Sequence, residues 1–176
     1  MDTIRVRKAL PGEGSKIIAF YYDLIEKLQG PNSPIRWTQG VYPVQNDIEN
    51  FIANEEMYIA EQGEVIVGAF GLNHNQGEGY DVVNWGCNAE PDKVSVLHLL
   101  AVTPDIHRSG LGTRLLTEAV EISKSMGDLA MRLDTLPFNT PGRGLYERFG
   151  FSYCGDVTLD YPSTGKVEFS MYEYVY

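Results

Sequence analysis

The segment from Val94 to Thr103 constrains the fold most, because it is the most apolar stretch of the chain. An apolar run of this length without polar alternation is typical of a strand that is buried on both faces of a sheet. Pro104 ends the run, and a loop with two glycines, Gly110 and Gly112, precedes a helical pattern. The sequence therefore predicts a central strand, a glycine-containing loop and a helix in succession.

Apolar spacing and turn residues place further elements on both sides of this unit. In chain order we expect a strand at 3–9, helices at 17–28 and around 48–52, a hairpin of 57–62 and 65–72, an extended piece at 80–85, the central strand, a helix at 111–126, a strand at 130–135, a helix at 140–149 and closing strands at 151–159 and 166–174. The order β-α-α-β-β-β-α-β-α-β-β predicts an α/β (α+β) fold with a mixed sheet and helices on both faces. No linker or repeat divides the 176 residues, so we expect a single domain over residues 1–176.

Composition limits the partners that this chain can have. The net charge of −10 argues against nucleic acid, since binding to polyphosphate needs a basic surface. No run approaches the length of a membrane span, and the first twenty residues lack the apolar core of a secretory signal. Two cysteines, Cys87 and Cys154, are too few for a disulfide framework or a CxxC metal site. We therefore expect a cytoplasmic protein without a metal, a membrane or a nucleic-acid partner.

The negative charge is concentrated in one part of the chain. From Trp37 to Asp92 there are ten acidic residues and no Lys or Arg, whereas the rest of the chain holds fourteen residues of each sign. A solvated acidic face is one interpretation. The other is an electric field that attracts a cationic substrate such as an amine.

The loop after the central strand has the chemistry of a phosphate cradle. Glycines at a helix start let the backbone approach a bulky anion, and the first-turn N–H groups and the helix dipole favour that anion. The third glycine of a dinucleotide fingerprint is replaced by Leu115, and no G-K-[ST] follows as in a Walker A loop.

These residues resemble the GNAT superfamily of acetyl-CoA-dependent N-acetyltransferases. The strand end Leu100-Ala101-Val102-Thr103-Pro104 matches the family's L-x-V-x-P. Gly110 and Gly112 match the glycines of its [QR]-x-x-G-x-[GA] loop, although His107 stands where the family has Gln or Arg. The resemblance implies a mixed, mostly antiparallel central sheet of about seven strands flanked by helices on both faces.

A second signature of the family follows at the right distance. Asn139 and the run Tyr146-Glu147-Arg148-Phe149-Gly150-Phe151 resemble the pattern N-x(6)-Y-E-x-x-G-F, and Leu133-Asp134-Thr135 fits the strand before it. Two spaced motifs joined by a helix and a strand are more specific than either motif alone. Together they cover residues 94–151.

The resemblance implies direct attack of an amine on the thioester carbonyl, through a tetrahedral intermediate. By analogy, the backbone N–H of Leu100 meets the oxyanion, Val102 binds the pantetheine arm, and Tyr146 protonates the leaving thiolate. The expected acetyl-CoA-binding residues are Leu100, Ala101, Val102, His107, Arg108, Ser109, Gly110, Leu111, Gly112, Thr113, Asn139 and Tyr146. Asn139 has a second interpretation as a helix cap.

His98 is a candidate for the base that deprotonates the amine. It interrupts the apolar strand, imidazole titrates near neutral pH, and some arylalkylamine-type members of the family have a strand histidine there. The position of a catalytic Glu in other members is Val96 here. A buried His98 that only shapes the pocket, or water relaying to a residue of the acidic segment, are the alternatives.

The acceptor pocket is expected near the early helices and their loop. Aromatic faces beside carboxylates would suit a cationic amine, and core packing is the alternative for these rings. The candidate rings are Trp37, Tyr42, Tyr80 and Trp85. The candidates for the phosphates of coenzyme A are Arg108, Arg114, Arg143 and Arg148.

The sequence thus predicts an acetyl-CoA-dependent N-acetyltransferase that acts on the primary amine of a small molecule. The alternatives are a protein or peptide N-acetyltransferase and a non-catalytic acetyl-CoA-binding module. A homodimer is compatible with the sequence.

Overall fold

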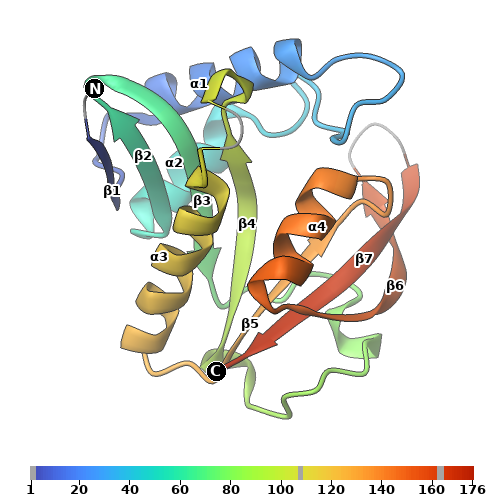
Figure 1. Cartoon of the computed structure of the whole chain (residues 1–176). Helices are drawn as coiled ribbons and strands as arrows, with labels where there is room; N and C mark the ends of the chain where they lie inside the picture. Colours follow the sequence, from blue (N-terminus) through green and yellow to red (C-terminus); the bar gives the residue numbers. More distant parts are fainter. Residues whose placement is uncertain (1–2, 107–108, 162–164) are drawn as a thin grey trace. The chain divides into compact units, whose positions relative to one another are not determined.

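The computed structural model describes residues 3–106, 109–161 and 165–176. Along the chain (Figure 1) the elements follow the order that the sequence predicts, with short 3₁₀ helices (η) between some of them. Their bounds are β1 Ile4–Lys8, α1 Gly14–Lys27, α2 Gln45–Ala53, β2 Met57–Gln62, β3 Val65–Asn73, η1 Tyr80–Val82, η2 Pro91–Lys93, β4 Val94–Val102, η3 Pro104–Ile106, α3 Leu111–Ser125, β5 Ala130–Thr135, α4 Thr140–Phe149, β6 Ser152–Tyr161 and β7 Gly165–Val175.

The seven strands form one open sheet in the order β1-β2-β3-β4-β5-β7-β6. The pairs β1–β2, β2–β3, β5–β7 and β6–β7 are antiparallel, and β4–β5 is parallel. This confirms the predicted fold class. No helix in the described ranges combines the length and the apolar character needed to cross a membrane.

The extended piece predicted at 80–85 is wrong, because the chain turns there into the 3₁₀ helix η1. Gly79 enters the turn with a φ of 83°, which glycine adopts at little cost. The carbonyl of Tyr80 then accepts the N–H of Val83 at 3.4 Å and the indole N–H of Trp85 at 2.8 Å. These local bonds replace the ladder that an extended segment would need.

By the density of its contacts the chain divides into two compact units. Unit 1 comprises residues 1–72 and 98–118, and unit 2 comprises residues 73–97 and 119–176. The chain passes between the units at the end of β3, within β4 and within α3. The single domain over 1–176 stays a prediction.

Unit 1 has a core between its helices and its strands. The apolar stripe of α1, including Ile17 and Tyr21, packs with Ile48 of α2 against Ile59 and Ala69 of the sheet. The opposite face of β3 is also covered in unit 1. A Cβ on Gly68 would lie 2.8 Å from the side chain of Leu115 on α3, so only glycine lets this helix approach so closely.

Unit 2 is built around β7, which pairs along its length with both β5 and β6. One face of these strands carries an apolar cluster with the 3₁₀ segment. Its buried members are Tyr80, Val96, Leu136, Phe169 and Met171.

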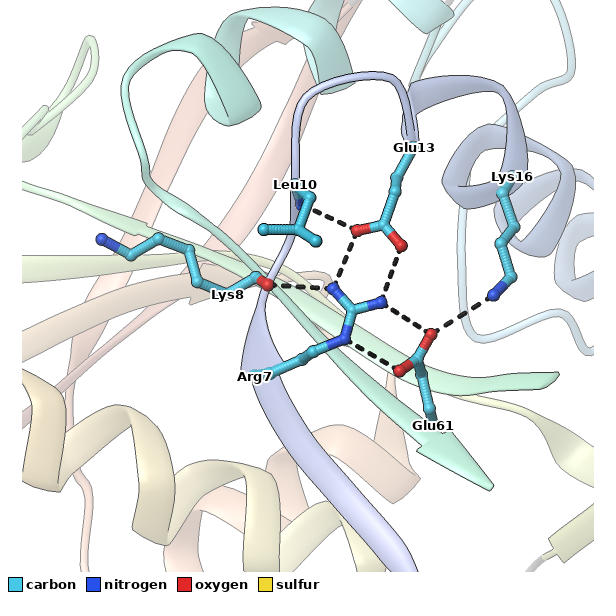
Figure 2. Close-up of polar contacts among 6 residues, drawn as sticks. All are labelled: Arg7, Lys8, Leu10, Glu13, Lys16 and Glu61. Carbon is cyan, nitrogen blue, oxygen red and sulfur yellow. Dashed lines mark hydrogen bonds and ion pairs between the residues drawn. The ribbon is translucent and has the colours of Figure 1, made fainter. Parts of the chain in front are cut away.

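An ion-pair network ties β1, β2 and the start of α1 together in unit 1 (Figure 2). The guanidinium of Arg7 contacts Glu13 at 2.6 Å and Glu61 at 2.8 Å, and Lys16 reaches Glu61 at 3.2 Å. Glu13 also accepts the backbone N–H of Leu10 at 2.7 Å. The bonds from Arg7 lower the pKa of Glu13 to about 2 and also lower the pKa of Glu61. Their carboxylates therefore stabilise the folded chain while they are ionised.

We expect the substitution Arg7→Met to lower the free energy of unfolding by about 1–2 kcal/mol at neutral pH. The pKa of both glutamates is lower in the folded chain than in the unfolded chain. Their contribution to the free energy of unfolding is therefore at its full value above the pKa of an unfolded glutamate. It is lost as the pH falls toward 2, so the two proteins should converge between about pH 5 and about pH 2. Urea unfolding followed by circular dichroism measures the difference. Arg5→Met, at an exposed position of the same strand, is the control and should cost less than about 0.5 kcal/mol. An equal loss in both variants would contradict the network's role.

Candidate functional site

Strand β4 carries a bulge at the position where the sequence predicts catalytic groups. Leu99 has a φ of 53°, which is unusual for a residue with a branched side chain. The ring of His98 contacts Phe51 of α2, while Leu99 and Ala101 lie in the core formed by α1 and α2. Residues 98 and 99 therefore face the same layer, whereas neighbours in a regular strand face opposite sides.

A buried hydrogen bond holds this bulge. The hydroxyl of Tyr21 on α1 donates to the carbonyl of Leu99 at 2.7 Å, and Tyr21 is fully buried. Trp37 packs edge-on against Tyr21 with the ring centroids 5.6 Å apart. A buried carbonyl needs a hydrogen-bond donor, and the hydroxyl of Tyr21 supplies one.

The parallel ladder of β4 and β5 comprises three pairs, from Val94–Ala130 to Val96–Arg132. β4 continues to Val102, and β5 continues to Thr135 in register with β7. After the bulge, Leu100 and Val102 are half-buried and alternate with buried Leu99 and Ala101. The residues of β4 that the sequence assigns to acyl chemistry, Leu100 and Val102, lie beyond the last of these pairs with β5.

The glycine loop leads into α3 as predicted. Gly110 has a φ of 78°, and a Cβ there would meet no atom within 4 Å, so the loop is open at this point. The helix begins at Leu111, whose N–H is bonded to the Ser109 hydroxyl at 3.3 Å. Gly112 and Thr113 follow in the first turn, where N–H groups have no intrahelical partner. His107 and Arg108 lie outside the described residues.

Tyr146 is buried in α4, and its role as an acid stays a prediction beside the alternative that the ring only packs the core. It is 7% exposed and packs against Phe151 and Tyr172, with centroid distances of 5.9 and 6.0 Å. Burial raises the pKa of Tyr146, and the nearby charge of Asp134 raises it further. The phenol therefore stays protonated at neutral pH.

Asn139 caps α4 in the structure, which is the second of its two predicted interpretations. Its amide oxygen accepts the N–H of Gly142 at 3.1 Å, and its amide nitrogen donates to Thr135 at 2.9 Å. A Cβ on Gly142 would lie 2.4 Å from that amide, so the glycine makes room for the cap. The assignment of Asn139 to acetyl-CoA stays a prediction.

His98 differs from the expectation that its imidazole titrates near neutral pH. Burial lowers the pKa of His98 to about 4, because the charged ring would lose its hydration. At neutral pH the ring is uncharged. The role of His98 as the base stays a prediction, as do the alternatives to it.

The four predicted aromatic residues fall into two groups. In unit 1, Trp37 and Tyr42 pack against the α1–α2 core. In unit 2, the rings of Tyr80 and Trp85 lie 5.4 Å apart and line a cavity of about 1010 Å³. The guanidinium of Arg132 stacks on Trp85 at 4.3 Å, so one face of this indole already holds a cation.

Of the arginines proposed for phosphates, Arg143 is engaged within unit 2. It donates to the hydroxyl of Tyr172 and to the carbonyl of Pro137, both at 2.9 Å. Arg114 and Arg148 are exposed.

Part of the acidic segment is paired rather than free. Glu55 binds Lys8 at 2.9 Å, and Glu61 binds Arg7 and Lys16. Within the described ranges, no group of three or more His, Cys, Asp or Glu side chains is arranged to hold a metal ion.

Sequence reasoning missed a buried carboxyl group at Asp134 of β5. The Tyr80 hydroxyl donates to it at 2.8 Å, and burial raises the pKa of Asp134. A charged residue directly after the buried Leu133 of this strand was the available signal.

The comparisons with known proteins agree with this geometry. The model of the acetyltransferase (GNAT) family matches residues 22–151. The chain belongs to this family. An uncharacterized N-acetyltransferase of Methanocaldococcus jannaschii is 34% identical over 68 residues, which is 39% of this chain and 30% of that protein.

Solved structures of other proteins show the same fold. A GNAT acetyltransferase of Streptococcus agalactiae has a TM-score of 0.77 and 21% identity, covering 98% of this chain and 95% of that one. The acetyltransferase yncA of Salmonella typhimurium, described as putative and solved with acetyl-CoA, has a TM-score of 0.69 and 13% identity over 98% and 94% of the chains.

We expect the substitution Tyr21→Phe to lower the free energy of unfolding by about 1–2 kcal/mol, because it leaves the Leu99 carbonyl buried without its donor. Amide NMR shifts should change at residues 99 and 100. The control is Tyr22→Phe, which removes a hydroxyl that accepts an exposed N–H from Gly40 at 3.1 Å and should cost less than about 0.5 kcal/mol. Urea unfolding measures the loss of unfolding free energy in each variant. Equal losses would show that the buried hydrogen bond contributes no more to stability than the exposed one.

Proposed function

We propose that this protein transfers an acetyl group from acetyl-CoA to the primary amine of a small molecule. The observation that carries the proposal is the bulge at Leu99, directly before the matched strand end and the glycine loop. A bulge turns main-chain groups out of a ladder, which is what an oxyanion donor requires. The acetyl-CoA bound to the Salmonella relative supports the choice of donor substrate.

Backbone groups of unit 1 would hold the donor substrate. The N–H groups at the start of α3, next to Gly110 and Gly112, suit the pyrophosphate. Leu100 would donate its N–H to the oxyanion, and Val102 would bind the pantetheine arm. These contacts use the main chain. The unusual His107 would therefore remove one side-chain contact and would not affect the backbone N–H groups that bind the phosphates.

Tyr146 would give its proton to the departing thiolate of coenzyme A. The raised pKa of Tyr146 keeps the proton on the phenol at neutral pH, so the form that can donate is present when the thiolate leaves. His98, uncharged at neutral pH, would contribute a polar wall rather than a charge.

The acceptor class follows from charge. The chain carries a net charge of −10, and Tyr80 and Trp85 line a cavity together with Glu78 and Asp81. Aromatic faces and carboxylates suit an ammonium group.

We expect Tyr146→Phe to lower kcat by about 10²-fold or more while the affinity for acetyl-CoA stays the same, because only proton transfer is lost. Release of coenzyme A thiol measures the rate, and calorimetry measures the affinity. Tyr153→Phe, on the exposed edge strand β6, is the matched control. Unchanged turnover in Tyr146→Phe would remove the assignment of the acid.

We expect His98→Gln to leave the pH dependence of kcat/KM unchanged between about pH 6 and about pH 8, since a group with a pKa of about 4 does not titrate there. The measurement is the pH–rate profile of both proteins. A limb near neutrality that disappears in the variant would restore His98 as the base.

The function itself is tested with two measurements. Acetyl-CoA should raise the melting temperature with occupancy, and the enzyme should acetylate amines in a panel of benzylamine, spermidine, glucosamine and an alanyl peptide. Transfer to the peptide alone would support the protein N-acetyltransferase. Thermal stabilisation without any transfer would support a binding module, and no stabilisation would end the proposal.

A further inference from the structure

Helix α1 is bonded to the chain on both sides of the strand end that the proposed function assigns to acetyl-CoA. Tyr21 donates its hydroxyl to the carbonyl of Leu99 at 2.7 Å, directly before that strand end. Further along both segments, the ammonium of Lys27 donates to the carboxylate of Asp105 in η3 at 2.5 Å. The residue numbers of both pairs differ by 78, so α1 and this segment run in the same direction within unit 1.

The short helix η3 lies at the surface. None of its three residues is buried, and a cavity of about 650 Å³ lies beside it. Asp105, Ile106 and Lys27 help to line this cavity. Burial of apolar side chains therefore contributes little to the position of η3. The ion pair between Lys27 and Asp105 ties it to α1, which is anchored in the core of unit 1.

η3 connects the sheet to the proposed phosphate loop. On one side, the N–H of Thr103 donates to the carbonyl of Val67 on β3 at 2.9 Å. On the other side, the N–H of the exposed Ser109 donates to the carbonyl of Ile106 at 3.3 Å. Backbone N–H groups bind an anion best when they are already in place, because ordering a loop on binding costs conformational entropy. A contact that holds η3 therefore favours binding of the pyrophosphate.

The contacts of Lys27 favour a structural link over direct attraction of a phosphate. Lys27 also contacts Asp23, four residues earlier on α1, at 2.8 Å. The hydrogen bonds to Asp105 and Asp23 raise the pKa of Lys27, so the lysine stays charged. Its charge is already shared between two carboxylates, and Lys16 and Glu64 at the same cavity carry opposite charges.

We propose that Lys27 and Asp105 are positioning residues for acetyl-CoA, because their ion pair links α1 to η3 and holds the phosphate loop in the conformation that binds the pyrophosphate. This inference rests on the proposed acetyl transfer. It adds two residues that lie outside the motifs quoted for the family and that need not touch the substrate.

The first variant removes the lysine. Lys27→Met should raise the Kd of acetyl-CoA by about threefold to fivefold, as the loss of an exposed ion pair allows. The KM for acetyl-CoA should rise by a similar factor while kcat stays the same, because the reacting groups are untouched. Lys27→Arg should restore the affinity. Titration calorimetry at low ionic strength measures Kd, and release of coenzyme A thiol measures KM and kcat.

The second variant separates positioning from simple charge attraction by the sign of its effect. Asp105→Asn removes a negative charge, so an effect of charge alone would make the anionic acetyl-CoA bind more tightly. If the ion pair positions the loop, Asp105→Asn should instead weaken binding by about threefold. The double variant with Lys27→Met should bind no more weakly than the weaker single variant, because both changes break the same link.

Asp23→Asn is the matched control. It removes a carboxylate from the same lysine but keeps the link from α1 to η3, so Kd should stay within about twofold of the wild type. The melting temperature of each variant without ligand checks its folding and should change by no more than about 2 °C, since these side chains are exposed. If Lys27→Met does not fold, Lys27→Gln should give the same result.

The outcomes separate the two proposals. An unchanged Kd in Lys27→Met, tighter or unchanged binding in Asp105→Asn, or an equal loss in Asp23→Asn would overturn the positioning role and leave the acetyltransferase standing. A wild type that does not bind acetyl-CoA would overturn the proposed function, and this inference with it.

Discussion

The hydrogen bond from the hydroxyl of Tyr21 to the carbonyl of Leu99 is the interaction on which the proposed site depends. A φ of 53° at a leucine is strained by about 1–2 kcal/mol, and it persists only when its surroundings determine it. Here the buried phenol of Tyr21 donates a hydrogen bond to the carbonyl of Leu99. Because Tyr21 lies on the apolar stripe of α1, the packing of that helix fixes the shape of the strand.

Local patterns predicted the elements well, and contacts between distant residues escaped them. The hairpin of β2 and β3, β5 and α4 begin where the sequence places them, since period, glycine and proline act over a few residues. The bulge has no such signal, because Leu99 is an apolar residue in an apolar run and its partner Tyr21 lies 78 residues away. The apolar pattern of residues 80–85 predicts an extended segment. It does not reveal the hydrogen bonds that the Tyr80 carbonyl accepts, and these bonds hold the turn.

The charged residues show the same difference between what a local pattern predicts and what distant contacts decide. The composition locates the excess of acids, yet only the structure shows that Glu61 is paired with Arg7 and Lys16 (Figure 2). The usual pKa of imidazole suggested a base at His98, and burial lowers that pKa to about 4. Desolvation lowers the pKa of a group that is charged when protonated, such as histidine. It raises the pKa of a group that is charged when deprotonated, such as aspartate. Burial therefore lowers the pKa of His98 and raises the pKa of Asp134.

The proposed roles rest on two kinds of chemistry. The groups proposed to hold acetyl-CoA are main-chain groups near Leu99 and at the start of α3, and these depend on glycines and on backbone shape. The proposed acid, Tyr146, is a side chain buried among aromatic residues. Binding by main-chain groups requires glycines at a fixed spacing, and this short sequence motif indicates the family. Recognition of the acceptor depends on side chains brought together by the fold, and this is why the motifs alone left the acceptor unnamed.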